Sequence, residues 1–290
     1  MGCCPWSNWQ WKSCTYCRLA RRSGLNPDKA WRWLRDLLAR EAGFQTAHLH
    51  ESGLSYHLTQ LAHQQGHTSA EALISHLYRH PESLPRSQLI EALLNYETRF
   101  FRDPHLFSLL QKEILPSLLR QNSSVRIWSA ACATGQEAYS LALLWDTYFA
   151  NQGQLELFAS DLSAQALNCA RAGQYPAQDI AQQLAPEYLA NFRPKGELQE
   201  ISSHLRRSIQ WRQFNLIHPW PAQPQLDLLM LRNVLIYLRP EHKLRILTQA
   251  AHRIRSGGYL ILGISESLVP LPPDFKPVFL DRAGGCFMRC

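Results

Sequence analysis

Hydrophobic residues recur at helical spacing through the first third of the chain. Between Asn26 and Asn95 they form four short amphipathic segments without strand-like alternation. The four apolar stripes are Trp31, Leu34, Leu37 and Leu38; Leu54, Leu58 and Leu61; Leu73, Ile74 and Leu77; and Leu89, Ile90, Leu93 and Leu94. Because short amphipathic helices bury their apolar stripes against one another, these residues are predicted to form a small all-α domain.

From residue 96 onward, short apolar runs alternate with helical segments. Strands that alternate with helices indicate a mainly parallel, doubly wound α/β sheet. The tail departs from this order, because two apolar runs there flank Asp281–Gly285 and predict an antiparallel hairpin at the end of the sheet. The expected strands are residues 125–128, 155–162, 209–216, 226–231 and 259–264, with the hairpin in 276–280 and 286–289; the expected helices include one that closes at Pro116 and those at 163–172 and 240–255.

This change of pattern divides the chain into three parts. Residues 1–25 form a leader rich in Cys and Trp for which no fold is predicted. Residues 26–95 form the helical domain, and residues 96–290 form the α/β domain. Within the α/β domain, Leu198–Ile201 and Ile209–Phe214 are strand-like pieces that predict a small β subdomain at about residues 192–214.

The stretch from Val125 to Ser140, VRIWSAACATGQEAYS, gives the strongest indication of a ligand site. An apolar run gives way to small residues that include Gly135, and then to a helical pattern. In a doubly wound sheet the crevice beyond such a strand holds a nucleotide-like ligand, and the first helical N–H groups face it without intrahelical partners. The turn lacks GxGxxG, which disfavours a dinucleotide and favours a nucleoside without phosphates, such as S-adenosylmethionine.

Polar residues end three further strands at the same edge. Asp161 ends the second strand, where a carboxylate can accept hydrogen bonds from both ribose hydroxyls; its alternative role is the N-cap of the next helix. Asn215–Leu216 and Asn233–Val234 end the next two strands. An amide there can pair with an adenine edge or an amino-acid moiety, and its apolar neighbour can pack on a purine face. For both asparagines, ordinary turn chemistry is the alternative.

Charge and hydropathy narrow the classes of partner. The formal net charge is +7, but the basic residues are scattered and accompany no nucleic-acid-binding motif, so nucleic-acid binding is disfavoured and an acidic protein partner fits at least as well. The sequence has no apolar run of the roughly 18 residues that a membrane span requires, and its start lacks the apolar segment of a signal peptide. We therefore expect a soluble, cytoplasmic, monomeric protein that does not insert into a membrane.

Eight cysteines raise the question of a metal. Cys3, Cys4, Cys14 and Cys17 cluster in the leader and include one C-x-x-C pair, which could hold a structural zinc. The adjacent pair at residues 3 and 4 does not have zinc-ligand spacing, so a leader without metal is preferred and no metal site is predicted. The remaining cysteines, Cys132, Cys169, Cys286 and Cys290, are expected to be small buried hydrophobes.

A resemblance to one family unites these observations. The chain resembles the CheR-type chemotaxis protein-glutamate O-methyltransferases over about residue 26 to the C-terminus, most firmly from Thr98 to Leu268. The matching segments occur in the family's order and are TRFFRD (98–103), WSAACATGQEAYSLA (128–142), FASDLS (158–163), the Asn215–Leu216 pair, LRNVLIYL (231–238) and GGYLILGISESL (257–268).

The resemblance implies a class I, Rossmann-like methyltransferase domain that uses S-adenosylmethionine as methyl donor. It implies methylation of glutamate side chains on the cytoplasmic signalling helices of chemoreceptors, in sensory adaptation. The family's cofactor-binding positions correspond to Thr98, Arg102, Glu137, Asp161, Asn215, Leu216, Asn233 and Val234. Arg102 and Tyr237 correspond to positions near the reacting groups and are the predicted catalytic residues. For these two, an ion pair of Arg102 with Asp103 or Glu97, and a core position for Tyr237, are the structural alternatives.

Three departures from the family pattern bear on function. Tyr96 replaces an asparagine, and Gln136–Glu137 replaces a Glu-Glu pair, both at positions implied to contact the cofactor. The helix that is basic in receptor-binding members is here ESGLSYHLTQLAHQ (51–64), without Lys or Arg. Two further functions are therefore considered: a methyltransferase for another protein or a small molecule, and a non-catalytic adapter that acts through its helical domain.

Overall fold

The computed structural model describes residues 27–45, 54–94, 97–222, 224–278 and 285–290. The Cys/Trp-rich leader with its zinc alternative, the departure at Tyr96 and most of the loop at Asp281–Gly285 lie outside the described residues. The chain divides into two compact units, Met1–Leu93 and Leu94–Cys290.

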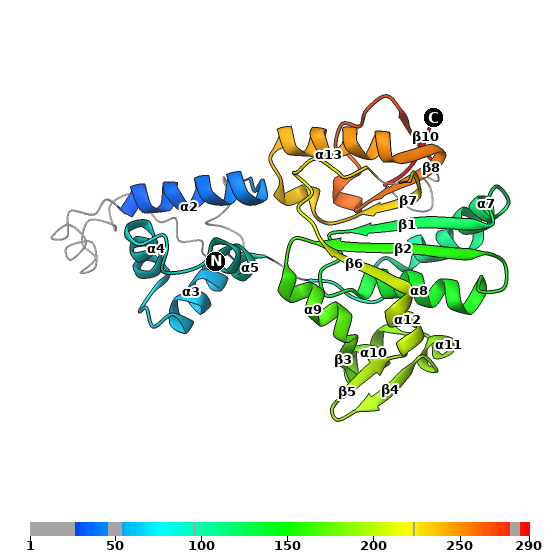
Figure 1. The fold of residues 1–290 in the computed structure, drawn as a ribbon, viewed down its shortest axis with the longest axis horizontal. Helices are drawn as coiled ribbons and strands as arrows, with labels where there is room; N and C mark the ends of the chain where they lie inside the picture. The colour runs from blue at the N-terminus through cyan, green and yellow to red at the C-terminus, as the bar shows by residue number, and fades with distance from the viewer. Residues whose placement is uncertain (1–26, 46–53, 95–96, 223, 279–284) are drawn as a thin grey trace, which may run out of the picture. The chain divides into compact units, whose positions relative to one another are not determined.

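The first unit contains four described helices with an aliphatic core (Figure 1). They are α2 (Pro27–Ala42), α3 (Leu54–Gln64), α4 (Ala70–Arg79) and α5 (Arg86–Leu93). The helix α4 begins where the Ser69 side chain accepts a hydrogen bond from the N–H of Ala72, as an N-cap does. Leu34, Leu58, Ile74 and Leu89 from the four helices are buried, so the predicted stripes face a common core.

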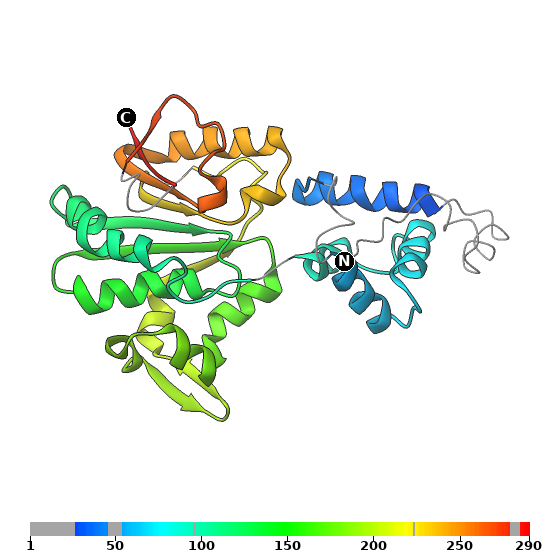
Figure 2. The same cartoon turned by 180° about the vertical axis from the view of Figure 1, so that it is seen from behind.

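The second unit is built on a seven-stranded sheet with strand order β6-β2-β1-β7-β8-β10-β9 (Figures 1 and 2). The strands are β1 (Ser124–Ala130), β2 (Gln154–Asp161), β6 (Ile209–Gln213), β7 (Leu226–Leu231), β8 (Ile254–Leu262), β9 (Phe275–Pro277) and β10 (Cys286–Arg289). The first five are parallel to one another, whereas β10 runs antiparallel to both β8 and β9. This arrangement confirms the predicted doubly wound sheet with an antiparallel C-terminal hairpin.

The two faces of this sheet differ around β1 and β2. On one face Val125, Ile127 and Leu157 are buried beneath α7 (Leu115–Leu119) and α8 (Gln136–Tyr148). On the other face, Figure 1 shows no helix in front of β1, β2 and β6. Arg126 and Glu156 form an ion pair there, 2.7 Å between Nη2 and Oε2. A parallel sheet is usually covered on both faces, so this half-open face is a distinctive feature of the unit.

The other helices cover the remaining parts of the sheet. Between β2 and β6 lie α9 (Ala164–Ala172), α10 (Ala177–Gln183), α11 (Pro186–Leu189) and α12 (Ser203–Ser208). After β7 come the 3-10 turn η4 (Leu235–Tyr237) and α13 (Pro240–Arg253), which packs on β8, and after β8 comes the 3-10 turn η5 (Ile264–Glu266).

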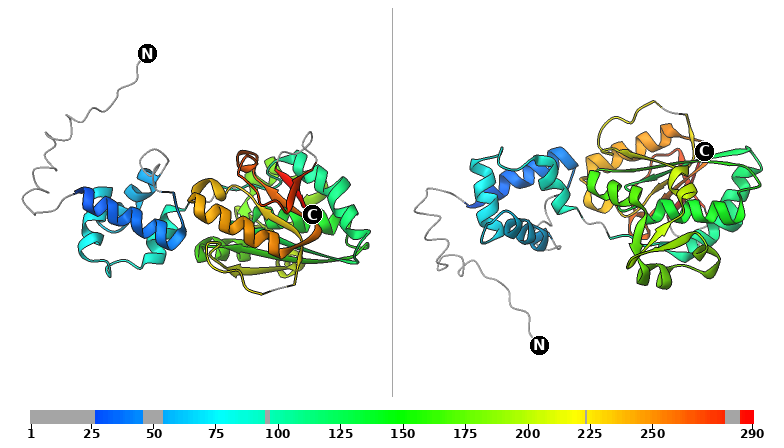
Figure 3. Two further views of the ribbon diagram at one scale, coloured as in Figure 1. Left: turned by 90° about the horizontal axis from the view of Figure 1, so that it is seen from above. Right: turned by 60° about the horizontal axis from the view of Figure 1, so that its bottom comes forward.

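The small β subdomain overlaps the predicted range of 192–214 only in part. Its three antiparallel strands are β3 (Gln174–Pro176), β5 (Leu198–Ile201) and β4 (Phe192–Lys195), seen at the bottom of Figure 1 and again in Figure 3. Ile209–Gln213 instead pairs with β2 as an outer strand of the large sheet. The predicted range of 192–214 therefore begins too late and ends too late, because a four-residue strand carries too little pattern to identify its partner.

The helix before β1 also extends further than predicted. It runs through α6 (Pro104–Leu109), a π-helical turn η3 (Leu110–Ile114) and α7, so it passes Pro116 and ends at Leu119. The N–H of Leu115 donates to the carbonyl of Leu110, five residues back. A wider turn of this kind lets a helix accommodate a proline that has no N–H to donate.

Candidate functional site

A strained turn connects β1 to α8 at the carboxyl edge of the sheet. Ala131 and Ala133 have φ values of 58° and 48°, in the left-handed region that residues with a Cβ rarely adopt. Gly135 follows with φ 97°, and a Cβ there would lie 2.8 Å from the Cβ of Ala170. Strain of this kind persists only where the surroundings enforce it, and it is concentrated at functional sites.

Asp161 braces this turn from the end of β2. Its carboxylate accepts hydrogen bonds from the N–H of Ala133 at 2.8 Å and from the N–H of Ser163 at 2.9 Å. The N-cap of α9 is Ser163, whose hydroxyl accepts from Ala166 at 3.0 Å, so the N-cap alternative for Asp161 is excluded. A carboxylate can accept several hydrogen bonds at once, and this one lies at the carboxyl edge of the sheet, at the end of β2.

The two asparagines lie in turns after β6 and β7. The Oδ1 of Asn215 accepts from the N–H of Ile217 at 3.3 Å, and the adjacent Leu216 is buried. Asn233 has a left-handed backbone with φ 57°. Turn chemistry is therefore present at both positions. It also fixes both backbones at the carboxyl edge, where the predicted ligand residues are expected to converge.

Glu266 joins the ends of β7 and β8. This carboxylate is fully buried and accepts hydrogen bonds from the N–H groups of Asn233 at 2.7 Å, Gly263 at 2.9 Å and Ile236 at 3.3 Å. A buried carboxylate is retained only where donors satisfy it. Glu266 therefore determines how the segment after β7 is held against the segment after β8. It was not predicted as a site residue, although it lies within the motif GISESL.

Glu137 faces the interior of the unit from the first turn of α8. Its Oε1 accepts from the hydroxyl of Ser129 at 2.8 Å, and its Oε2 pairs with Nη1 of Arg232 at 3.0 Å. The Arg232 side chain is only 2% exposed, and its guanidinium also pairs with the carboxylate of Asp103 and donates to the carbonyl of Arg102 at 3.2 Å. One buried arginine thus ties the linker, α8 and β7 together.

The position of Arg232 in the sequence is a usable signal. It occupies the second position of LRNVLIYL at the end of an otherwise apolar strand, where a charged residue has to be paired. Asp103, the last residue of TRFFRD, is its partner. Because partners that are 129 residues apart in the chain meet only after folding, neither residue was predicted as part of the site.

The linker from residue 97 to residue 103 is held by several contacts of its own. Thr98 and Arg102 are half-buried, and Nη1 of Arg102 donates to the carbonyl of Glu97 at 3.0 Å. The N–H of Phe101 donates to the hydroxyl of Ser140 at 2.8 Å. Since the Asp103 carboxylate pairs with Arg232, the suggested ion pair between Arg102 and Asp103 is not the arrangement in the structure.

Tyr237 lies on η4 and is 41% exposed, which excludes the alternative of a core aromatic residue. Val234, immediately before η4, is half-buried. Gln136, the departure next to Glu137, accepts a hydrogen bond from the hydroxyl of Thr134 at 2.8 Å and is thereby held within the strained turn.

Cys132 lies within the strained turn and stays uncharged. Burial, followed by the negative charges of Asp161 and Glu137, raises the pKa of this thiol well above its usual value. Cys286 is also buried, and burial raises its pKa to about 12. Cys169 and Cys290 are exposed, so the prediction that all four would be buried is wrong for these two, which lie at a helix surface and at the C-terminus.

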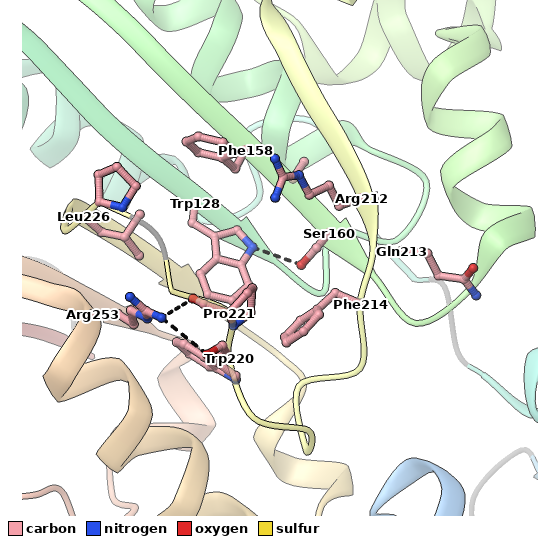
Figure 4. A pocket seen from close by; sticks show the side chains of 12 residues that line it. Trp128, Phe158, Ser160, Arg212, Gln213, Phe214, Trp220, Pro221, Leu226 and Arg253 are labelled. Carbon is pink, nitrogen blue, oxygen red and sulfur yellow. Dashed lines mark hydrogen bonds between the residues drawn. The ribbon is translucent and has the colours of Figure 1, made fainter.

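A pocket of about 70 Å³ lies on the half-open face of the sheet, apart from the predicted ligand residues (Figure 4). Its lining includes Trp128, Phe158, Phe214, Trp220 and Arg212. The indole N–H of Trp128 donates to the hydroxyl of Ser160 at 2.9 Å. None of the eight predicted cofactor residues lines this pocket, so it is a feature separate from the carboxyl edge.

The described residues contain neither a metal-binding cluster nor a membrane-spanning helix. Within the described ranges, no group of three or more His, Cys, Asp or Glu side chains is arranged to hold a metal ion. No helix in the described part of the chain combines the length and the apolar character needed to span a bilayer.

The chain is similar in sequence to proteins of one family. A family model described as CheR methyltransferase, SAM binding domain, matches residues 96–283. "Chemotaxis protein methyltransferase Cher2" of Pseudomonas putida is 35% identical over 234 residues, which cover 78% of this chain and 85% of that protein. "Chemotaxis protein methyltransferase 1" of Pseudomonas aeruginosa is 36% identical with the same coverage.

A solved S-adenosylmethionine-dependent methyltransferase from Methanosarcina mazei is 15% identical, with a TM-score of 0.32, over 49% of this chain and 52% of its own. The family model spans more than half of this chain, and 85% of each Pseudomonas relative is covered. The chain therefore belongs to the CheR family of S-adenosylmethionine-dependent chemotaxis protein methyltransferases.

Proposed function

We propose that this protein transfers the methyl group of S-adenosylmethionine to glutamate side chains on the cytoplasmic signalling helices of chemoreceptors, giving glutamate methyl esters. The observation that carries the proposal is the carboxyl edge, where the strained turn, Asp161 and the segments after β6 and β7 converge in a member of the CheR family. Ligands of doubly wound sheets bind at this edge.

The residues present fit this cofactor. Asp161 lies at the edge where the ribose hydroxyls would bind and its carboxylate can accept several hydrogen bonds, and Asn215 with Leu216 can accommodate the adenine edge and face. Asn233 and Val234, together with Thr98 and Arg102, would hold the amino-acid moiety or the sulfonium end. Glu137 would act by holding Arg232, since both of its carboxylate oxygens already have partners within the protein.

When bound, the cofactor supplies an electrophilic methyl group on a sulfonium. The acceptor carboxylate, with a reference pKa near ~4.3, is ionised at neutral pH, so the protein needs no general base. Its residues have to align the acceptor oxygen and remove water, and orientation of this kind can lower a barrier by several kcal/mol, out of roughly 7–11 kcal/mol available from proximity.

Arg102 and Tyr237 are the proposed catalytic residues. The Arg102 guanidinium would hold the acceptor carboxylate or the carboxylate of the cofactor. Tyr237 would line the channel through which the acceptor reaches the edge, and its 41% exposure is consistent with a side chain that meets a protein substrate. We also propose that the protein works as a monomer in the cytoplasm.

The test is transfer of labelled methyl groups from S-adenosylmethionine to purified cytoplasmic fragments of chemoreceptors from the same organism. Base-labile release of the label as methanol identifies an ester. Arg102→Ala should lower kcat/KM at least about tenfold, whereas Arg99→Ala, at an exposed position in the same linker, should not.

Two results would contradict the proposal. Label that resists base would mean a different acceptor atom, and transfer only to non-receptor proteins would mean a different substrate. If Arg102→Ala binds S-adenosylhomocysteine normally and keeps the full methylation rate, the role assigned to Arg102 is wrong.

A further inference from the structure

Two neighbouring turns at the carboxyl edge present large apolar side chains to solvent. They are residues 235–238 after β7 and residues 264–268 after β8. Of the ten exposed large hydrophobic side chains among the described residues, four lie on these turns: Ile236, Tyr237, Ile264 and Leu268. We call these four residues the edge patch. Ile264 is 66% exposed and Leu268 is 91% exposed, which is unusual for aliphatic side chains that belong to ordered turns.

The edge patch is held together from beneath. Glu266 lies in the second turn, and its carboxylate accepts the N–H of Ile236 from the first. The hydroxyl of Ser267 donates to the carbonyl of Ile264 at 2.7 Å, and the N–H of Val269 donates to the carbonyl of Glu266 at 3.0 Å. A fully buried carboxylate is costly to maintain, so its use to fix two surface turns indicates that their relative position matters.

The edge patch is continuous with the proposed site. Ile236 and Tyr237 follow Asn233–Val234 directly in the chain, and Glu266 binds the backbone of both Asn233 and Ile236. A protein substrate has to bring a carboxylate to this edge, and therefore its neighbouring residues must lie against the adjacent surface. Contiguous exposed apolar side chains typically mark such a contact surface.

We infer that the edge patch is the docking surface for the substrate helix that carries the acceptor glutamate. This inference rests on the proposed function. On a helix, apolar residues three or four positions from a glutamate lie on the same face, so they would meet the patch while the glutamate enters the site. Lys243 follows the patch in the chain and favours an acidic helix over a basic one, whereas Arg239 is paired with Glu241 at 3.7 Å.

The experiment compares exposed-residue variants that avoid the proposed catalytic and cofactor residues. The test protein is the double variant Ile264→Ser and Leu268→Ser, with Ile236→Ser as a second variant. The matched control is Leu189→Ser on α11, because Leu189 and Ile236 are equally exposed, at 41%. The readouts are KM and kcat for a helical receptor fragment, calorimetric binding of S-adenosylhomocysteine, and sedimentation of each protein.

The double variant should raise KM for the fragment about tenfold or more, with kcat and S-adenosylhomocysteine binding unchanged. Ile236→Ser should raise KM by a smaller factor, Leu189→Ser should leave it unchanged, and Leu268→Ile should retain the wild-type KM. Equal KM values for the double variant and the control would overturn the inference. So would a changed sedimentation coefficient, because the occupant would then be a second copy of the chain.

If the proposed function is wrong, the results will differ from those that contradict the docking inference. Wild-type protein would then bind S-adenosylhomocysteine but would not methylate the fragment. In that case, fluorescence anisotropy of the labelled fragment with wild-type and double-variant protein decides the docking inference independently. Weaker binding to the variant supports it, and equal or absent binding contradicts it.

Discussion

The helical unit and the carboxyl edge of the sheet differ in the side chains that they bury and in their backbone strain. Among the described residues, all eight buried polar or charged side chains belong to the second unit, and the helical unit buries only apolar ones. The five described non-glycine residues with left-handed backbones, Phe101, Asp103, Ala131, Ala133 and Asn233, also belong to the second unit. They gather in the linker and at the ends of β1 and β7.

This difference shows which part of the fold contains features that lower its stability. Burying leucine stripes stabilises a helical unit without any special geometry. Burying Arg232, Asp161 and Glu266 costs free energy unless every donor and acceptor is matched. Strain and buried charge at one edge therefore locate the part of the molecule that is constrained by more than stability.

The largest effect is expected from removing the buried arginine. Arg232→Met removes a buried cation and leaves the half-buried carboxylate of Glu137 unpaired, and it should lower the free energy of unfolding of the second unit by about 3–5 kcal/mol. Arg79→Met, at an exposed arginine on α4, should cost no more than about 0.5 kcal/mol. Urea unfolding of the full chain, followed by hydrogen exchange in β1 and in α4, measures both. If both substitutions lowered the free energy of unfolding by similar amounts, the proposed difference between the two regions would be wrong.

Removing the carboxylate beneath the edge patch should have the next largest effect. Glu266→Ala leaves three backbone N–H groups without their acceptor, that of Gly263 in a buried position, and should cost at least about 2 kcal/mol. Glu71→Ala removes a carboxylate from the first turn of α4 and should cost about 0.3–1 kcal/mol, because only the helix dipole is affected. Hydrogen exchange at Asn233 and Gly263 provides the local readout, and unchanged protection there would contradict the role of Glu266.

A smaller effect on stability but a clear one on binding is expected for Asp161→Asn. The amide keeps one acceptor for the turn but loses the charge, so stability should fall by about 1 kcal/mol. Affinity for S-adenosylhomocysteine should fall at least about tenfold, as measured by calorimetry. Asp36→Asn, at an exposed position on α2, serves as the control and should change neither quantity. Wild-type affinity in Asp161→Asn would mean that this carboxylate does not hold the ribose.

The smallest expected effect is a pH dependence of stability that has opposite direction in the two units. The pKa of Cys132 is raised above its usual 9.0, mainly by burial, so its contribution to stability is present below pH 9 and lost as the pH rises further. The pKa of His76 is lowered from 6.5 by desolvation and by His67 and His80, so stability is lost as the pH falls below 6.5.

Hydrogen exchange across this pH range should therefore show loosening of β1 and α8 at the alkaline end and of α4 at the acid end. Cys132→Ala should abolish the first change, and His76→Gln should abolish the second. Loosening of both units at the same end would contradict the assignment of these two groups.

Periodic patterns were sufficient for the long elements. The leucine stripes predicted α2 to α5, and the alternation after residue 96 predicted the parallel sheet and its hairpin. The bounds of the short elements, and of the helix that contains a π-helical turn, were not predicted correctly. The bounds of the small sheet were predicted only in part, because strands of three or four residues carry almost no period. The helix through Pro116 was ended too early because its π-helical turn has no sequence signal of its own.

At the carboxyl edge, too, some features could be predicted from the sequence and others could not. The positions of Asp161, Asn215 and Asn233 at the carboxyl ends of strands could be predicted, since each strand has a recognisable pattern. The buried residues that hold these strand ends in place could not be predicted in this way. Arg232 joins residues 95 and 129 positions away, and Glu266 joins residues 30 and 33 positions away. Pairings of this range depend on the order of strands in the sheet, which local pattern does not encode.

The sequence by itself determined that there is a helical unit and an α/β unit, and which strand ends carry polar residues. The reason is that burial of apolar stripes and the preferences of turn residues act over a few positions of the chain. The tertiary structure decided which buried charges are paired and which apolar turns remain exposed beside the site. Those outcomes depend on contacts between distant segments, whose desolvation costs are met only after the sheet has assembled.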